Sequence, residues 1–157
     1  MKHPKGPKDA LILNPGAGRE YQCGTMKAIF KADENETNEQ YSVSEWWLDP
    51  NSEGPGAHLH EENDEVFYVL EGVASILVGD QWVEADKGAF IRIPAGTIHD
   101  FANQTDKRAG LLNFFIPRRP ANAPSRPGTW NAVPPPMTPA PNRDGGVRNR
   151  SRRRASR

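Results

Sequence analysis

The stretch HLHEENDE, residues 58–65, is the part of this chain that decides its fold. Side chains alternate across a β-strand, so His58 and His60 point to the same face and lie close enough to hold one ion. Glu65 has the wrong parity for a continuous strand, but the polar residues 61–64 turn the chain. Glu65 then opens the next strand and faces back toward the two imidazoles. We therefore predict a hairpin that gathers three metal ligands.

A second stretch, GAFIRIPAGTIHDFAN at residues 88–103, supplies a fourth candidate ligand. Pro94 and Gly96 mark the end of one strand, and His99 begins the next. Three of the four histidines in the chain thus fall inside two compact patterns. We predict a single metal site built by all four candidates: His58, His60, Glu65 and His99.

These two patterns together resemble the two signature motifs of the cupin superfamily, in the form of a small, single-domain, quercetinase-like cupin. The first motif matches at its ligands and at its closing glycine: His58, His60, Glu65 and Gly72. The second motif matches throughout Gly88 to Asn103. The opening glycine of the family falls at Ser52 here, and because Gly54 and Gly56 are nearby, we expect a shifted turn. The resemblance implies a jelly-roll β-barrel.

Short runs of β-branched and aromatic residues surround the motifs and predict an all-β domain. They lie at residues 41–48, 65–70, 73–78, 81–84, 89–93 and 109–116. Gly79 and Asp80 give a two-residue hairpin signal between two of these runs, and no segment shows a convincing helical period. We predict a barrel over residues 41–117, preceded by a partly irregular N-terminal arm (1–40) in which Leu11 to Leu13 form a short edge strand.

The segment 118–157 differs from the barrel in composition and charge. Residues 117–157 contain nine prolines, ten arginines and one acid, so little apolar surface is available to offset the entropy of ordering, and we predict a disordered tail. Residues 1–116 carry 10 Lys+Arg and 19 Asp+Glu, a net charge of −9. Nucleic-acid binding would therefore depend on the tail alone. The tail is either an electrostatic hook with a polyproline docking run or a solvated appendage.

Cysteine content and hydropathy indicate the compartment. With Cys23 as the one cysteine, no intrachain disulfide can form. The N-terminal residues have no apolar run of signal-peptide length, and no segment approaches the roughly 18 apolar residues of a membrane span. We expect a soluble, cytoplasmic protein that does not bind membranes.

Side chains near the proposed ligands carry further predictions. Strand parity places three apolar residues on the inward face, either as barrel core or as part of a substrate pocket: Phe67, Val69 and Phe101. Arg92 either binds a carboxylate or enolate of the substrate or faces solvent. Trp46 and Trp47 are adjacent, so one faces inward and one outward. The outward one is a candidate for the interface of a homodimer, which the resemblance to cupins implies.

Three neutral imidazoles and one carboxylate suit a divalent first-row metal: Fe, Mn, Ni, Cu, Co or Zn. The leading hypothesis is a dioxygenase-like oxidoreductase acting on an enol, catechol or flavonol-like small molecule, with Glu65 as ligand and as a base that can detach. The second hypothesis is a metal-dependent isomerase or cyclase, although the barrel region offers few cations for a sugar phosphate. The third is a non-catalytic module that binds a small molecule or a metal. The fold alone does not choose among them.

Overall fold

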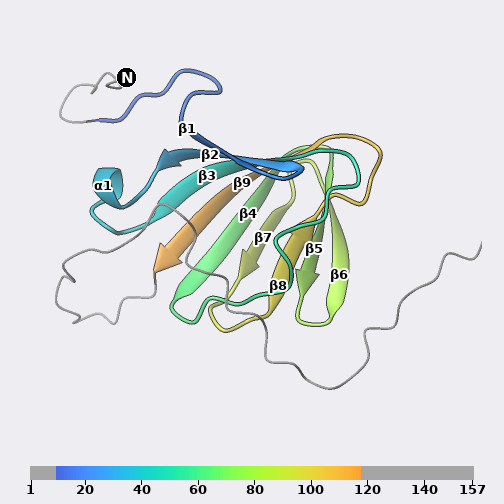
Figure 1. Ribbon diagram of the computed structural model, residues 1–157. Coiled ribbons are helices and arrows are strands. Elements are labelled where there is room, and N and C mark those ends of the chain that lie inside the picture. The colour runs from blue at the N-terminus through green and yellow to red at the C-terminus, as the bar shows by residue number, and fades with distance from the viewer. Residues whose placement is uncertain (1–9, 118–157) are drawn as a thin grey trace, which may run out of the picture.

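The computed structural model describes residues 10–117, which fold into two antiparallel sheets and one short helix (Figure 1). The strands are β1 (Arg19–Cys23), β2 (Met26–Ala32), β3 (Ser42–Leu48), β4 (Asn63–Glu71), β5 (Val73–Val78), β6 (Gln81–Asp86), β7 (Phe90–Ile93), β8 (His99–Ala102) and β9 (Ala109–Pro117), and the helix is α1 (Glu34–Thr37). This confirms the predicted all-β class.

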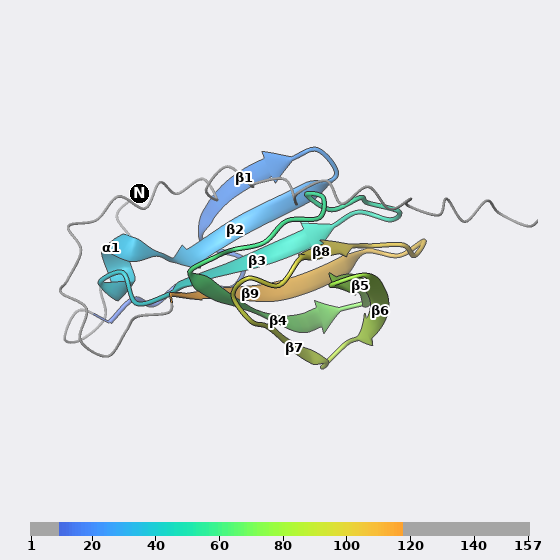
Figure 2. The ribbon, with the colours of Figure 1, turned by 90° about the horizontal axis from the view of Figure 1, so that it is seen from below.

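The main sheet has six strands in the order β1-β2-β3-β9-β4-β7, and the smaller sheet has three in the order β6-β5-β8. Figure 2 shows the strands of the main sheet side by side from β1 to β7. The last strand, β9, lies between β3 and β4, so segments far apart in sequence pair at the centre. The two antiparallel sheets, with the chain crossing between them, form the predicted jelly-roll barrel.

Alternation of side chains along each strand creates the core between the two sheets. In β4 the inward positions Glu65, Phe67 and Val69 are buried, whereas Tyr68 faces outward and is 42% exposed. The core cluster combines inward residues from both sheets, among them Leu48, Phe67, Ile76, Phe101 and Leu111. Burying such apolar side chains is the main favourable contribution to folding. Glu65, a candidate metal ligand, thus shares the inward face of β4 with two core residues, Phe67 and Val69.

The turn between β5 and β6 forms as the sequence predicts. Val78 pairs with Gln81, which leaves Gly79 and Asp80 as a two-residue connection. Gly79 has a φ of +65°, a conformation that glycine adopts without a steric cost. The hairpin places β5 against β8, the strand that begins with His99.

The segment before residue 41 contains more regular structure than expected. Strands β1 and β2 pair as a hairpin, and β2 pairs with β3 in the main sheet. In β2, Met26, Ala28 and Phe30 face the core and alternate with Lys27, Ile29 and Lys31. Of the intervening residues Ile29 is also buried. Residues 19–32 thus add two strands to the main sheet within the arm, residues 1–40, that the sequence predicts to be partly irregular. The patch from Leu11 to Leu13 is not a strand, since Leu11 makes only an isolated bridge.

The one-turn helix α1 was not expected from the sequence. Asp33 begins it as the N-cap, and its carbonyl accepts from the backbone N–H of Glu36 and Thr37. In the described range this is the one helix, and it is far too short to span a membrane. The predicted tail lies outside the described residues. The cytoplasmic location, the homodimer and the absence of nucleic-acid and membrane binding stay predictions.

Candidate metal centre

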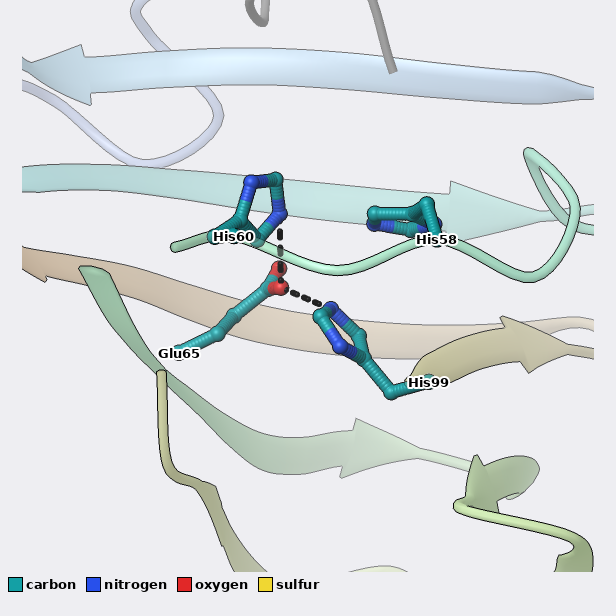
Figure 3. A group of neighbouring side chains, drawn as sticks. All are labelled: His58, His60, Glu65 and His99. Atoms are coloured by element: carbon teal, nitrogen blue, oxygen red, sulfur yellow. Dashed lines mark hydrogen bonds and ion pairs between the residues drawn. The ribbon is translucent and has the colours of Figure 1, made fainter. Parts of the chain in front are cut away.

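The four predicted ligands come from three separate parts of the chain and meet at one place. His58 and His60 lie in the segment that leads into β4, Glu65 lies on β4, and His99 is the first residue of β8. Figure 3 shows the His60 and His99 rings approaching the carboxylate of Glu65, with the His58 ring beside them. One candidate ligand atom from each residue lies within 4.8 Å of all the others. The structure therefore brings together all four side chains that the motifs single out.

Each of the four residues is buried. Their exposed fractions are 3% for His58, 8% for His60, 2% for Glu65 and 1% for His99. The Nε2 atom of His99 lies 2.5 Å from Oε2 of Glu65, and the Nε2 atom of His60 lies 3.3 Å from the same oxygen. Taking ionisable groups out of water is costly unless they are paired or bind a metal. The four side chains are thus shielded from solvent, as expected for a metal-binding site.

Backbone hydrogen bonds tie two ligand-bearing segments together. The N–H of His58 donates to the carbonyl of His99 at 2.9 Å, and the N–H of His99 donates to the carbonyl of His58 at 2.8 Å. This isolated bridge adds the His58 segment to the edge of the smaller sheet beside β8. The two rings consequently lie 4.4 Å apart, centroid to centroid.

The orientation of two imidazoles is set by carbonyl groups two residues earlier. Nδ1 of His58 lies 2.7 Å from the carbonyl oxygen of Gly56, and Nδ1 of His99 lies 2.9 Å from that of Thr97. A carbonyl oxygen can only accept, so each Nδ1 must carry the proton. Nε2 is then the atom that each ring presents to a metal ion, the arrangement that protein carbonyls commonly impose on histidine ligands.

The ionisation of the cluster follows from burial and from close pairing. Burial lowers the pKa of His58, which favours the neutral ring that a metal requires. Burial alone would raise the pKa of Glu65, but the neighbouring His60 and His99 nitrogens outweigh it and lower that pKa to about 2. Burial opposes the charged form of His99 as well, yet the hydrogen bond to Glu65 prevails and raises the pKa of His99. Glu65 is therefore an anion at neutral pH.

The donor set fits a divalent first-row metal. The buried Nε2 of His60 has no hydrogen-bond partner, because its 3.3 Å contact with Glu65 does not have hydrogen-bond geometry and is electrostatic only. A buried imidazole nitrogen normally has a hydrogen-bond partner. One that has none is free to bind a metal ion. Three imidazoles and one carboxylate provide the N and O donors that such ions prefer. The cluster can thus hold one divalent ion.

The other predicted site residues take two kinds of position. Phe67, Val69 and Phe101 lie in the core cluster, and the Phe67 and Phe101 rings pack 5.4 Å apart. Arg92 points outward from β7 with a side chain that is 52% exposed, and its guanidinium donates to Asp64 at 2.6 Å. The structure therefore places the three apolar residues inward, as parity predicts, and Arg92 on the solvent face.

A cleft of about 520 Å³ lies elsewhere on the domain. It is lined by Asn51, Ser52, Glu53, Gly54, Gly56, Trp82, Asp100, Ala102, Asn103 and Gln104. Asp100 follows His99 directly on β8, so the two side chains point to opposite faces of the strand. The cleft includes none of the predicted substrate-pocket residues, whose contact with a substrate stays a prediction.

One residue at the centre was not anticipated from the sequence. Asn113 on β9 is completely buried, and its Nδ2 donates to Oε1 of Glu65 at 2.7 Å. The only sequence signal is an asparagine inside the largely apolar run AGLLNFFI at residues 109–116, since a buried amide must find hydrogen-bond partners. Its partner depends on the register of β9 against β4.

The match to a family model identifies the class of protein. The model described as "Cupin domain" matches residues 44–115, which span β3 to β9 and include all four ligand candidates. Together with the two antiparallel sheets and the motif residues, this match identifies residues 44–115 as a cupin domain. The fold and the motif residues both agree with the resemblance seen in the sequence.

One curated relative has a described activity. Quercetin 2,3-dioxygenase from Bacillus subtilis is 30% identical over 108 residues, which is 64% of this chain but 30% of that protein. The chain thus spans about a third of the length of this relative. The similarity is to that part of the enzyme.

Solved structures share the fold at low sequence identity. A predicted oxalate decarboxylase from Thermotoga maritima superposes with a TM-score of 0.59 at 18% identity, over 65% of this chain and 93% of that one. An RmlC-like cupin from Shewanella frigidimarina gives a TM-score of 0.58 at 22% identity, over 69% and 90%. These likenesses concern the fold alone.

Proposed function

We propose that this cupin domain binds one divalent transition-metal ion at His58, His60, Glu65 and His99 and acts as a dioxygenase-like oxidoreductase. The substrate class that we propose is an enol, catechol or flavonol-like small molecule. The single observation that carries metal binding is the meeting of four buried donors, among which His60 Nε2 has no hydrogen bond. The similarity to quercetin 2,3-dioxygenase supports the choice of oxygen chemistry.

When bound, such an ion would supply Lewis acidity and a template for an oxygen-bearing substrate. The protein's contribution is to hold the donors still. His58 and His99 are oriented through Nδ1, and Glu65 adds the negative charge that a divalent cation needs. The neighbouring apolar core, which includes Phe67 and Phe101, excludes water and so strengthens electrostatic interactions at the site.

Glu65 is better suited to the role of ligand than to that of base. A carboxylate with a pKa of about 2 is ionised at neutral pH, but it accepts protons weakly. Both of its oxygens are also in use, since Oε1 accepts from Asn113 and Oε2 lies against His99. Acting as a base that detaches would require it to give up these partners. We therefore assign Glu65 to metal binding first.

The test is elemental analysis of the purified full chain, the His99→Ala variant and a His3→Ala control. His3 is the histidine outside the two motifs, so its removal changes the histidine content and leaves all four candidate ligands in the sequence. We expect about one transition-metal ion per chain in the wild type and in the control, and loss of the ion in His99→Ala. Oxygen uptake is then measured on a panel of flavonols and catechols.

Each outcome distinguishes among the hypotheses. Metal together with oxygen uptake on any panel member supports the dioxygenase. Metal without uptake on the panel moves the assignment to the isomerase or cyclase, or to a non-catalytic binding module. Absence of metal from the wild type, even after reconstitution with each candidate ion, contradicts the proposal. Circular dichroism of His99→Ala shows whether the variant is folded.

A further inference from the structure

We propose that Asn113 is a positioning residue that holds Glu65 as a one-oxygen ligand of the metal ion. This inference rests on the metal binding proposed above and deepens it. Asn113 Nδ2 donates to Oε1 of Glu65 at 2.7 Å, while Oε2 is the oxygen that faces His99 and His60. One carboxylate oxygen is thus occupied by an amide, and the other is left for the ion.

The register of three central strands brings the amide to this position. Asn113 on β9 lies opposite Ser44 on β3 and opposite Phe67 on β4. Glu65 is two residues before Phe67 on β4, so it shares the inward face with Asn113. Neighbours on one face of a sheet that are offset by two residues remain within reach of longer side chains. The amide therefore reaches Glu65 without leaving its strand.

A chain of hydrogen bonds fixes which end of the amide faces Glu65. The indole Nε1 of Trp46 donates to Ser44 Oγ at 3.1 Å, and Ser44 Oγ donates to Asn113 Oδ1 at 3.5 Å. An indole N–H can only donate, so Ser44 must accept from Trp46 and has its own proton free for Asn113. The carbonyl end of the amide then faces Ser44. Its NH₂ end consequently faces Glu65.

In this amide orientation every polar group of the network has a hydrogen-bond partner, and burial makes that requirement strict. Trp46, Ser44 and Asn113 have exposed fractions of 7%, 2% and 0%, so water has little access to the network. The second amide hydrogen of Asn113 points to the carbonyl of Val66 at 3.5 Å. A reversed amide would place its oxygen against an ionised carboxylate and leave donors without acceptors. Each hydrogen bond in the series from Trp46 through Ser44 and Asn113 to Glu65 therefore has a fixed donor and a fixed acceptor.

The consequence for metal binding follows from the geometry of a carboxylate. An unrestrained carboxylate can turn and offer both oxygens to an ion, whereas one whose Oε1 is held by Asn113 offers Oε2 alone. Partners that orient metal ligands typically contribute about 10–100-fold to metal affinity. We expect removal of the amide to lower the affinity within this range and to change the coordination of the ion.

The experiment uses the full chain loaded with Co²⁺, whose visible absorption spectrum reports coordination number and geometry. Three variants are compared with the wild type. Asn113→Leu removes the amide and nearly preserves its shape. Ser44→Ala leaves the amide but removes the hydroxyl that orients it. Asn103→Leu is the matched control, because Asn103 is also a buried asparagine, 1% exposed, whose amide binds the carbonyls of Leu48, Asp49 and Lys107.

Co²⁺ affinity is measured by competition with a chelator, and the spectrum is recorded at saturation. For Asn113→Leu we expect a loss of affinity of about 10–100-fold and an altered spectrum. For Ser44→Ala we expect a smaller loss in the same direction. For Asn103→Leu we expect a lower unfolding midpoint with the wild-type affinity and spectrum. That contrast separates a positioning role from general loss of stability.

Two results overturn the inference, and they differ from failure of the proposed function. A folded Asn113→Leu protein with wild-type affinity and a superimposable spectrum overturns it while metal binding stands. If Asn113→Leu does not fold, a Ser44→Ala protein indistinguishable from the wild type in both measurements overturns it as well. A wild-type protein that binds no Co²⁺ and no other candidate ion contradicts the metal site itself, and with it this inference.

Discussion

The position of His58 depends on how closely a single glycine lets the chain approach β8. Gly54 lies four residues before His58, and a Cβ added there would overlap the carbonyl oxygen of Phe101 and approach Oδ1 of Asp100 to 2.6 Å. The obstacle is largely backbone, which cannot turn aside as the end of a side chain can. Glycine is required here by close approach.

We expect Gly54→Ala to lower the free energy of unfolding by about 1–3 kcal/mol, the usual range for overpacking. Because the segment must move away from β8, we also expect weaker metal binding through His58. The control is Gly24→Ala, at a turn with a φ of +60° and no atom within 4 Å of the added Cβ. That change should cost about 1–2 kcal/mol from backbone conformation alone.

Urea denaturation and chelator competition measure the two effects. A Gly54→Ala protein with wild-type stability would show that the close approach to Phe101 is unnecessary. Weakened metal binding in Gly24→Ala would show that the effect on the site is not specific to Gly54.

Single residues also show where prediction from sequence succeeds and where it stops. His58, His60, Glu65 and His99 meet in the structure because the motif spacing and strand parity were sufficient to place them. The role of Asn113 required the register of β9 against β4, which is set by pairing between residues 39 to 54 positions apart in the sequence. A shift of one residue would turn that side chain outward, and the sequence does not reveal such registers directly.

The N-terminal elements are held to one another by a small ionic network. Arg19 on β1 donates to Asp33 at 2.6 Å and to Glu36 of α1 at 2.9 Å. The backbone N–H of Asp33 also donates to Glu36 at 3.0 Å, as in a capping box. Burial alone would raise the pKa of Glu36, but these hydrogen bonds prevail and lower it to about 2. The charged form of Glu36 therefore stabilises the contact between β1 and α1.

The sign of the pH dependence follows from that lowered pKa. The contribution of Glu36 is present above its ordinary pKa of 4.5 and is lost as the pH falls toward about 2. Because the network is partly exposed, solvent screening limits the contribution to about 1 kcal/mol or less. We expect Glu36→Gln to be less stable than the wild type at pH 6, with the difference closing near pH 2.5.

Urea unfolding of both proteins across this pH range measures the difference directly. Glu20→Gln is a suitable control, since Glu20 makes a longer contact of 3.6 Å with Lys27 on the exposed side of the hairpin. A difference between wild type and Glu36→Gln that stays constant with pH would contradict this account.

The strands and the helix before residue 41 were not predicted from the sequence. The polar run at residues 31–40 has no apolar period, and α1 exists because of Asp33, Glu36 and their contact with Arg19. The β2 strand did carry an alternation, in Met26, Ala28 and Phe30, but it is short and flanked by turns. By contrast, six of the seven strands from β3 to β9 lie within the predicted runs or within two residues of their ends. The exception is β8, of which the sequence predicted only the start at His99.

At the scale of the whole molecule, metal binding should be coupled to stability. An ion that binds only the folded chain raises the free energy of unfolding by about 2.7 kcal/mol at a free concentration 100 times its Kd. For a domain of this size each kcal/mol raises Tm by about 4 °C or more. We expect a Tm increase of several degrees with the preferred ion and little change in His99→Ala. Scanning calorimetry with and without a chelator measures it, and equal shifts in both proteins would indicate binding elsewhere.

The backbone bridge between His58 and His99 has a consequence for the choice of ion. Because those hydrogen bonds do not involve the side chains, the ligand-bearing segments are held in place before any ion arrives. A site that is formed before metal binding presents the same donor atoms to every candidate ion. Its affinity is therefore expected to rise in the order from Mn²⁺ to Cu²⁺. Cells counter that order by controlling which ions are available. The same polypeptide would then carry different ions in cells that differ in metal supply, without any change in its shape.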